Sequence, residues 1–138
     1  MILSDHLIEL NIHITAISRQ IAKRYLLSFS QYSMIMKIDS SGIPVSKLAT
    51  ILGLDKSTLT RNINVLIERD IVEKIRDNSD FRIYNIFLSN KGENIKKQLY
   101  LDLDYFTNKL LALSKNNLKD QLNLLDKLIQ ELNKREIS

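Results

Sequence analysis

The sequence is poor in the residues that interrupt helices, and it contains no cysteine at all. Its 138 residues include one Pro and three Gly, with no Cys and no Trp. Without Cys, the chain can form neither a disulfide nor a thiol-based redox sensor. Because Pro and Gly are the residues that most often end helices, so few of them in this length predict a mainly helical protein.

Long apolar runs and a strong charge bias are also missing. No uninterrupted apolar stretch approaches the ~20 residues that a membrane-spanning helix needs. The first residues lack a basic segment and are broken by Asp5 and Glu9, so we expect no secretion signal and a cytoplasmic protein. Lys and Arg total 20 against 16 Asp and Glu, and this net charge of +4 permits a polyanionic partner without identifying one.

The residues needed for catalysis or metal binding do not occur in a recognisable arrangement. We find no Gly-rich phosphate loop and no carboxylate–histidine constellation. His6 and His13 are seven positions apart, with no Cys or third His to complete a metal site, so interface packing is the better interpretation. We therefore predict a protein that is not an enzyme and that holds no metal and no cofactor.

Three stretches carry apolar residues at alternating spacings of four and three, which is typical of helices that pack along one another. Helices are predicted over 5–26, after Ser89, and after a break at 114–117. Such faces exceed what a domain of this size can bury alone, so we predict a self-associated helical bundle. The mixed charges of the last helix fit this packing better than binding to a membrane surface. The repeating residues are Leu3, Leu7, Leu10, Ile14, Ile17 and Ile21; Leu99, Leu103, Phe106, Leu110 and Leu113; and Leu118, Leu122, Leu125, Ile129 and Leu132.

Two short helices separated by a tight turn are predicted in the middle of the chain. A helix that begins at Ser30 precedes them. The first of the pair covers 46–52 and is followed by Gly53, the residue type expected where a helix ends in left-handed geometry. The second covers 56–69, and Asp55 is placed to cap its N-terminus. The arrangement is that of a helix-turn-helix.

The pattern then changes from helical to strand periodicity. The runs 71–77 and 82–89 are rich in β-branched residues and predict a hairpin with a polar turn. Pro44 restricts its own extended segment to a sheet edge. We predict a mainly α fold of the α+β class, a winged helix-turn-helix domain with flanking long helices that form a dimerisation bundle. The predicted domains are an N-terminal dimerisation helix (1–29), a winged helix-turn-helix domain (30–92) and C-terminal dimerisation helices (93–138).

The helix expected over 56–69 has an unusual outer face. Exposed helix surfaces usually favour Glu, Lys, Gln and Ala, whereas this one carries hydroxyls and an Arg near its N-terminus. Free N–H groups and hydroxyls suit DNA phosphates, and an Arg bound to guanine by two hydrogen bonds contributes about 1–3 kcal/mol of base discrimination. Each hydroxyl taken singly is explained as well by capping. The candidate DNA-contacting residues are Lys56, Ser57, Thr58, Thr60, Arg61 and Asn64.

The segment from Val45 to Gly92 contains a series of short motifs in a fixed order: Leu48-Ala49, Leu52-Gly53, Ser57 to Arg61, Asp80-Phe81-Arg82 and Leu88-Ser89-Asn90-Lys91-Gly92. In these motifs the segment resembles the DNA-binding core of MarR-family regulators, and the outer helices resemble that family only in length, placement and apolar pattern. The resemblance implies a homodimer formed by the first and last two helices on a pseudo-palindromic double-stranded DNA site. It also implies that Arg82 enters the minor groove, positioned by Asp80; the alternative is an ordinary exposed turn pair.

The resemblance further implies a transcriptional repressor that a small aromatic or anionic effector releases from DNA. Arg19 and Tyr32 are the candidate effector-pocket residues, although such aromatic side chains are explained equally well as core and rim residues. A second interpretation stays open: a winged-helix module that binds a protein partner without sequence-specific DNA recognition.

Three positions depart from the family pattern. Members often have a basic residue where this chain has Val65, and Gly where it has Asp70. Phe81 stands where a basic residue is frequent at the wing tip. These departures suggest weaker electrostatic binding of DNA, or a narrower set of sites, than in a typical member.

Overall fold

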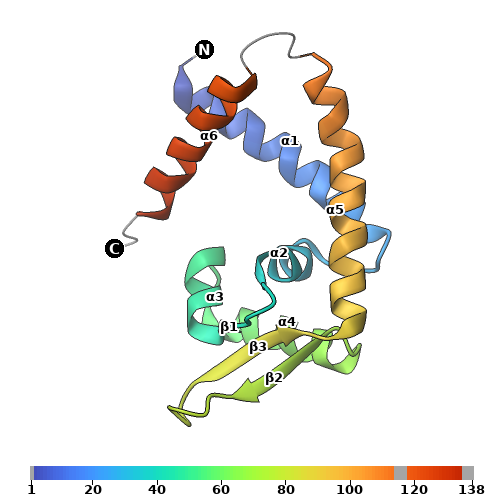
Figure 1. Cartoon of the computed structure of the whole chain (residues 1–138), viewed down its shortest axis with the longest axis vertical. Helices are drawn as coiled ribbons and strands as arrows, with labels where there is room; N and C mark the ends of the chain where they lie inside the picture. Colours follow the sequence, from blue (N-terminus) through green and yellow to red (C-terminus); the bar gives the residue numbers. More distant parts are fainter. Residues whose placement is uncertain (1, 114–117, 135–138) are drawn as a thin grey trace. The chain divides into compact units, whose positions relative to one another are not determined.

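The computed structural model describes residues 2–113 and 118–134 and confirms the winged-helix class. The break predicted at 114–117 lies outside the described residues. The helices are α1 (Leu3–Lys23), α2 (Phe29–Lys37), α3 (Val45–Leu52), α4 (Lys56–Glu68), α5 (Asn90–Leu111) and α6 (Leu118–Asn133), and the strands are β1 (Ile43–Pro44), β2 (Val72–Arg76) and β3 (Tyr84–Leu88) (Figure 1).

The chain divides into two compact units, with the division within α5 after Leu103. The first unit holds a core to which α1 to α5 and all three strands contribute side chains. Met34, Ile35, Leu48 and Leu66 at its centre are fully buried. None of the described side chains from Asp104 onward is buried, so the second unit has no core of its own.

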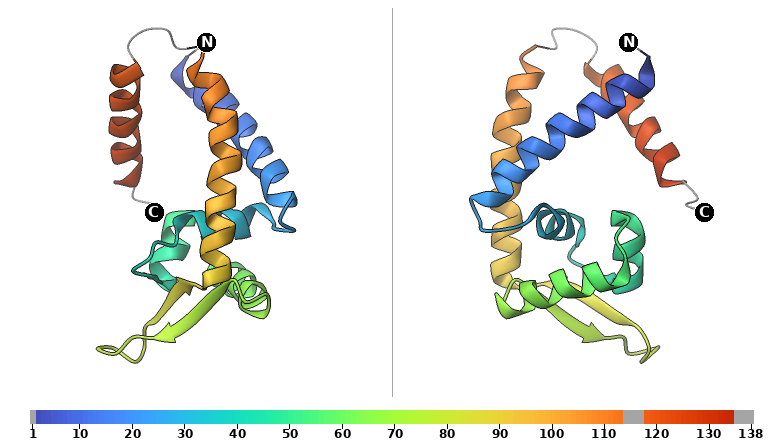
Figure 2. Two further views of the ribbon diagram at one scale, coloured as in Figure 1. Left: turned by 45° about the vertical axis from the view of Figure 1, so that its right-hand side comes forward. Right: turned by 180° about the vertical axis from the view of Figure 1, so that it is seen from behind.

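The sheet is antiparallel, with β3 between β1 and β2. Ile86 on β3 pairs with Ile43 on one side and Lys74 on the other, and its side chain is fully buried against the helices. Pro44 lies on the edge strand, as predicted, where its missing N–H breaks no ladder. The β2–β3 hairpin extends beyond the helices that pack on the sheet (Figure 2).

Several helix boundaries differ from the prediction by one to three residues. Helix α1 ends at Lys23 rather than at residue 26, and Leu26 itself has the left-handed conformation, with a φ of 56°. Helix α2 begins one residue before Ser30, because Ser28 is its N-cap. The N–H of Gln31 donates to the Ser28 hydroxyl at 3.1 Å, and the Ser28 N–H donates to the Gln31 side-chain oxygen at 3.1 Å. The sequence Ser28-x-x-Gln31 is the signature of this reciprocal capping box, and it indicates the start of α2 better than Ser30 does.

The start of α5 is tied closely to the turn between α4 and β2. The Ser89 hydroxyl accepts a hydrogen bond from the Gly92 N–H at 3.0 Å and donates to the carbonyl of Asp70. Gly92 is buried, and a Cβ built there would lie 2.1 Å from the carbonyl oxygen of Ile71. The Ser-x-Lys-Gly part of the sequence motif therefore has a structural role at this junction.

Replacing Gly92 by Ala is expected to lower the free energy of unfolding by about 2–3 kcal/mol, because the methyl would meet a backbone oxygen that cannot rotate away. Gly53→Ala is the matched control: its φ is 65°, but no described atom lies within 4 Å of the added Cβ. That variant should lose only about 1 kcal/mol through backbone strain. Urea unfolding measures both, and equal losses would contradict the steric explanation.

Asp70 has the backbone conformation of a glycine. Its φ is 57°, and only the C-cap residue Arg69 separates it from the end of α4 at Glu68. The N–H of Ile71 donates to the carbonyl of Leu66 at 2.9 Å. This hydrogen bond is typical of a helix that is followed by a residue in the left-handed conformation. The departure from the family pattern at this position changes the residue type, while the backbone keeps the shape that favours Gly.

Asp70→Gly is expected to stabilise the fold by about 0.5–1 kcal/mol, since Gly adopts this φ without steric strain. The substitution also removes a carboxylate from the negative end of the α4 dipole. Asp70→Asn separates the two effects, because it removes the charge and keeps the strained side chain, and it should give the smaller gain. Thermal unfolding of the three proteins tests this order, and a Gly variant less stable than the wild type would refute it.

Candidate nucleic-acid interface

Helices α3 and α4 form the predicted helix-turn-helix. Gly53 ends α3 in the left-handed conformation, and the N–H of Leu54 donates back to the carbonyl of Ala49 at 3.1 Å. Asp55 then caps α4, because its carboxylate accepts the N–H of Thr58 at 2.7 Å. Both predicted turn residues are confirmed in these roles.

The Asp55 carboxylate also binds the first two hydroxyls of α4. The Ser57 hydroxyl donates to Oδ1 at 2.7 Å, and the Thr58 hydroxyl donates to Oδ2 at 2.8 Å. The hydrogen bond from the Ser57 hydroxyl has the largest effect on the pKa of Asp55. Together with the bonds from the N–H and the hydroxyl of Thr58, it lowers this pKa to about 2. Both hydroxyl hydrogens are therefore committed to the cap, and each side chain offers an approaching ligand only its oxygen as an acceptor.

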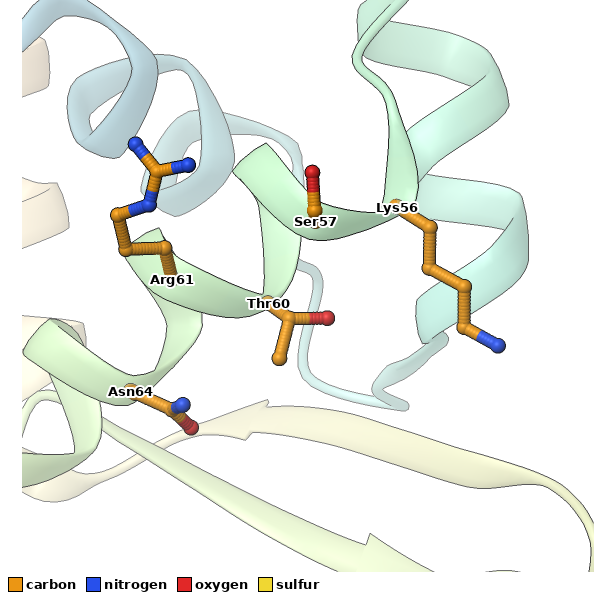
Figure 3. A pocket seen from close by; sticks show the side chains of 5 residues that line it. All are labelled: Lys56, Ser57, Thr60, Arg61 and Asn64. Carbon is orange, nitrogen blue, oxygen red and sulfur yellow. The ribbon is translucent and has the colours of Figure 1, made fainter.

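Four other side chains of α4 have no such internal role. Among the described residues, Lys56, Thr60, Arg61 and Asn64 make no side-chain hydrogen bond and no ion pair. With Ser57 they line a shallow depression of about 550 Å³ along the helix (Figure 3). This face of α4 thus presents unpaired donors of four kinds: an ammonium, a hydroxyl, a guanidinium and an amide.

The opposite face of α4 fixes the helix in the core. Leu59 and Ile63 are buried there, as the helical pattern predicted. A polar chain adds to this: the Gln31 side-chain N–H donates to Asn62 at 3.3 Å, and the Asn62 side chain donates to the carbonyl of Thr58 at 3.1 Å. Sequence reasoning missed this link between α2 and α4, because the two amides are far apart in the chain.

At the tip of the hairpin, the side chain of Arg82 is paired with the carboxylate of Asp80. The Arg82 guanidinium donates to both oxygens of Asp80, at 3.1 and 3.2 Å, and this bond lowers the pKa of the Asp80 carboxyl. Arg82 remains 90% exposed, whereas Asp80 is 33% exposed. The pairing that the resemblance implies is present, and the guanidinium is held in one orientation while it faces solvent.

A residue that sequence reasoning missed organises the same tip. The carboxylate of Asp77 accepts the N–H groups of Ser79 and Asp80 at 3.1 and 3.0 Å, the Ser79 hydroxyl at 2.6 Å, and the Asn85 amide at 3.0 Å. These bonds, led by the Ser79 hydroxyl, lower the pKa of Asp77. The Asp-x-Ser spacing is a signature of such a turn and was available in the sequence.

Cations continue from α4 onto the hairpin. Lys74 and Arg76 flank the ring of Tyr84, with their charged groups 4.6 and 5.2 Å from its centroid. Arg76 also donates to the Tyr84 hydroxyl, and this bond lowers the pKa of Tyr84. Lys56, Lys74 and Arg82 line one groove of about 610 Å³ that includes residues of α3, α4 and the hairpin. Helix face and wing therefore form one continuous basic surface.

Comparison with known proteins points to one family. The sequence model described as the MarR family matches residues 27–84, which is less than half of the chain. The transcriptional regulator MgrA of Staphylococcus aureus, an HTH-type protein, is 28% identical over 113 residues, which cover 81% of this chain and 76% of MgrA. In sequence the chain therefore resembles the MarR family. The comparisons support a DNA-binding transcriptional regulator of the winged helix-turn-helix type.

Solved MarR-family structures have the same fold as the chain. A MarR transcriptional regulator from Methanosarcina mazei Go1 has a TM-score of 0.81 at 21% identity, with 96% of each chain covered. A mutant of Staphylococcus aureus MepR, solved bound to an oligodeoxyribonucleotide, has a TM-score of 0.62 at 15% identity, covering 96% of this chain and 98% of MepR. At these identities the likeness establishes the fold alone.

The candidate effector residues lie side by side within the first unit. Tyr32 is buried in the core, and its ring stacks on Phe29 at 6.2 Å between centroids. The Arg19 guanidinium lies over the same Phe29 ring at 5.1 Å. Neither residue lines the depression along α4 or the basic groove, so their effector role stays a prediction.

No helix in the described part of the chain is both long and apolar enough to cross a bilayer. The His, Asp and Glu side chains of that part form no group of three or more that could hold a metal ion.

Proposed function

We propose that this chain is a homodimer that binds a pseudo-palindromic duplex site sequence-specifically and represses transcription by occupying it. The observation that carries the proposal is the unpaired polar face of α4, which continues into the basic groove and the exposed Arg82. A helix held rigidly by its buried face, with free donors on the other, suits reading base edges in the major groove.

The proposed contacts divide between readout and positioning. Arg61 would read guanine through two hydrogen bonds, with Asn64 and Thr60 on neighbouring base edges or phosphates, and Lys56 on a phosphate. Ser57 and Thr58 would accept rather than donate, because Asp55 holds their hydrogens. Arg82, oriented by Asp80, would enter the minor groove, where the negative potential is concentrated.

The proposed dimer follows from apolar surface that one chain leaves uncovered. Leu7, Leu10 and Ile14 on α1 are between 41% and 49% exposed. Helix α6 has no buried residue at all, although its apolar side chains recur at heptad spacing. An isolated amphipathic helix of this length is marginal in water, so a partner that covers it is expected. A second copy, joined through the segments 1–29 and 93–138, would leave two 30–92 domains to contact two half-sites.

A small aromatic or anionic effector that releases the DNA is the least constrained part of the proposal. It is supported by the exposed guanidinium of Arg19 beside the aromatic pair Phe29 and Tyr32. Thermal-shift screening of small aromatic acids tests it, with Arg19→Ala as the control. A hit that stabilises both proteins equally would remove Arg19 from the pocket.

Selection of bound sequences from random duplex DNA tests the proposed function. We expect an enriched palindrome with half-sites about 10 base pairs apart, centre to centre, and binding that weakens steeply with salt. MepR, a structural relative, has been solved on an oligodeoxyribonucleotide, which supports DNA as the partner. The alternative of a protein-binding wing predicts no enrichment and no salt-dependent DNA binding, and that result would reject our proposal.

A further inference from the structure

An aromatic side chain stands at the tip of the wing with no packing role in the described fold. Phe81 is 69% exposed and does not belong to the hydrophobic core cluster. Within the described residues its ring stacks on no other ring and on no cation. The neighbouring Arg82, Ile83 and Tyr84 line the basic groove, whereas Phe81 does not. The fold therefore leaves this ring in solvent, in the turn that joins β2 to β3.

The backbone that carries Phe81 is nevertheless fixed in place. The N–H of Ile83 donates to the carbonyl of Asp80 at 3.0 Å, so that Phe81 and Arg82 occupy the two central positions of a closed turn. Directly after β2, Asp77 accepts four hydrogen bonds and fixes the backbone that leads to the tip. The turn does not need an apolar residue at this point, so the ring is available for an external partner.

The surroundings of Phe81 indicate which partner. Arg82 is adjacent, and Lys74 and Arg76 lie on the two-stranded stem below it. A surface that combines one aromatic ring with a guanidinium and further cations suits a polyanion that also has a groove with apolar walls. The minor groove of duplex DNA is such a place, since its walls are sugars and its floor is the edges of stacked bases.

We propose that Phe81 enters the minor groove beside Arg82 and partly unstacks one base step, which kinks the duplex. This inference rests on the proposed DNA-binding function. The spacing is suitable, because neighbouring Cα atoms are about 3.8 Å apart, close to the rise of about 3.4 Å per base pair, so the two side chains can address adjacent steps. Apolar wedges of Phe or Leu in minor-groove binders act in this way.

A wedge gives the protein a source of sequence preference that uses no hydrogen bond. Pyrimidine–purine steps such as TA are unstacked more easily than the steps of an A-tract. The step beneath the wing should therefore be enriched for TA or CA in selected sites, at a position that Arg61 and the rest of α4 do not contact. Phe81 would in this way compensate for the missing basic residue at the wing tip.

The experiment uses the full-length protein and a duplex that the wild type selects from random DNA. 2-Aminopurine is placed at the step beneath the wing, and a second duplex carries a stiff AA step there. We expect the wild type to raise the 2-aminopurine fluorescence and to prefer the flexible step roughly tenfold. Phe81→Ala should abolish the fluorescence rise and the preference, and Phe81→Leu should keep most of both.

Ile75→Ala is the matched control, because it removes a comparably exposed apolar side chain from the hairpin stem rather than from its tip. It should leave fluorescence and step preference unchanged. If Phe81→Ala binds both duplexes as the wild type does, or weakens both equally without loss of the fluorescence signal, the wedge is rejected and the proposed function stands. If the wild type selects no DNA sequence, the wedge and the proposed function are both rejected.

Discussion

The double variant Leu10→Asp, Leu125→Asp is expected to be monomeric and to bind the selected palindrome at least about 100-fold more weakly than the wild type. Leu10 on α1 is 49% exposed and Leu125 on α6 is 46% exposed in the single chain. Each aspartate would be buried without a counter-charge if these faces meet a second copy, and an unpaired buried carboxylate is strongly destabilising. Loss of the dimer also removes the second half-site contact, which is the source of the large loss in affinity.

The control for this prediction adds the same charges beside the apolar faces. Asn11→Asp and Asn123→Asp introduce the same two carboxylates on α1 and α6 at exposed polar positions. Asn11 accepts a hydrogen bond from Thr15, and a carboxylate keeps that acceptor. Sedimentation equilibrium gives the oligomeric state, anisotropy gives the DNA affinity, and circular dichroism shows that both variants are folded. A leucine variant that remains dimeric with full affinity would refute the proposed interface.

The helix-turn-helix could be predicted from the sequence because short-range chemistry determines it. Gly53 permits a left-handed helix end, Asp55 caps the next helix, and Pro44 is confined to an edge strand whatever surrounds them. Each of these residues acts on neighbours within four positions. The periodicity of the inner arc of α4 likewise identified Leu59 and Ile63 as buried.

Where one side chain of the site has two possible partners, the sequence did not predict which partner it contacts. A hydroxyl near a helix N-terminus looks the same in sequence whether it contacts DNA or a capping carboxylate, and the structure gives the second use to Ser57 and Thr58. The amide chain from Gln31 to Asn62 joins residues that only the folded chain brings together. Sequence alone also could not show that Phe81 stands clear of the core.

Arg61 carries the second large prediction, because its side chain is exposed and, within the described residues, makes no hydrogen bond and no ion pair. Arg61→Ala should leave the folding stability unchanged and reduce affinity for the selected palindrome on the order of 100-fold, since each of two half-sites loses a contact of about 1–3 kcal/mol. Repeated selection with this variant should lose the preference at one base pair per half-site. Ser57→Ala is the comparison on the same helix face: it removes one proposed acceptor and should reduce affinity far less than Arg61→Ala, because the hydroxyl hydrogen is already bound to Asp55.

Arg61→Lys separates charge from geometry. Lysine keeps the positive charge but lacks the planar fork that matches guanine, so the variant should keep the salt dependence of the wild type and lose its base preference. Arg82→Ala should behave in the opposite way, lowering affinity for all sequences and reducing the salt slope by about one for each protomer. If Arg61→Ala selects the same palindrome with undiminished affinity, the major-groove role of this face of α4 is wrong, and the basic groove beside the wing would be left to bind DNA through its backbone alone.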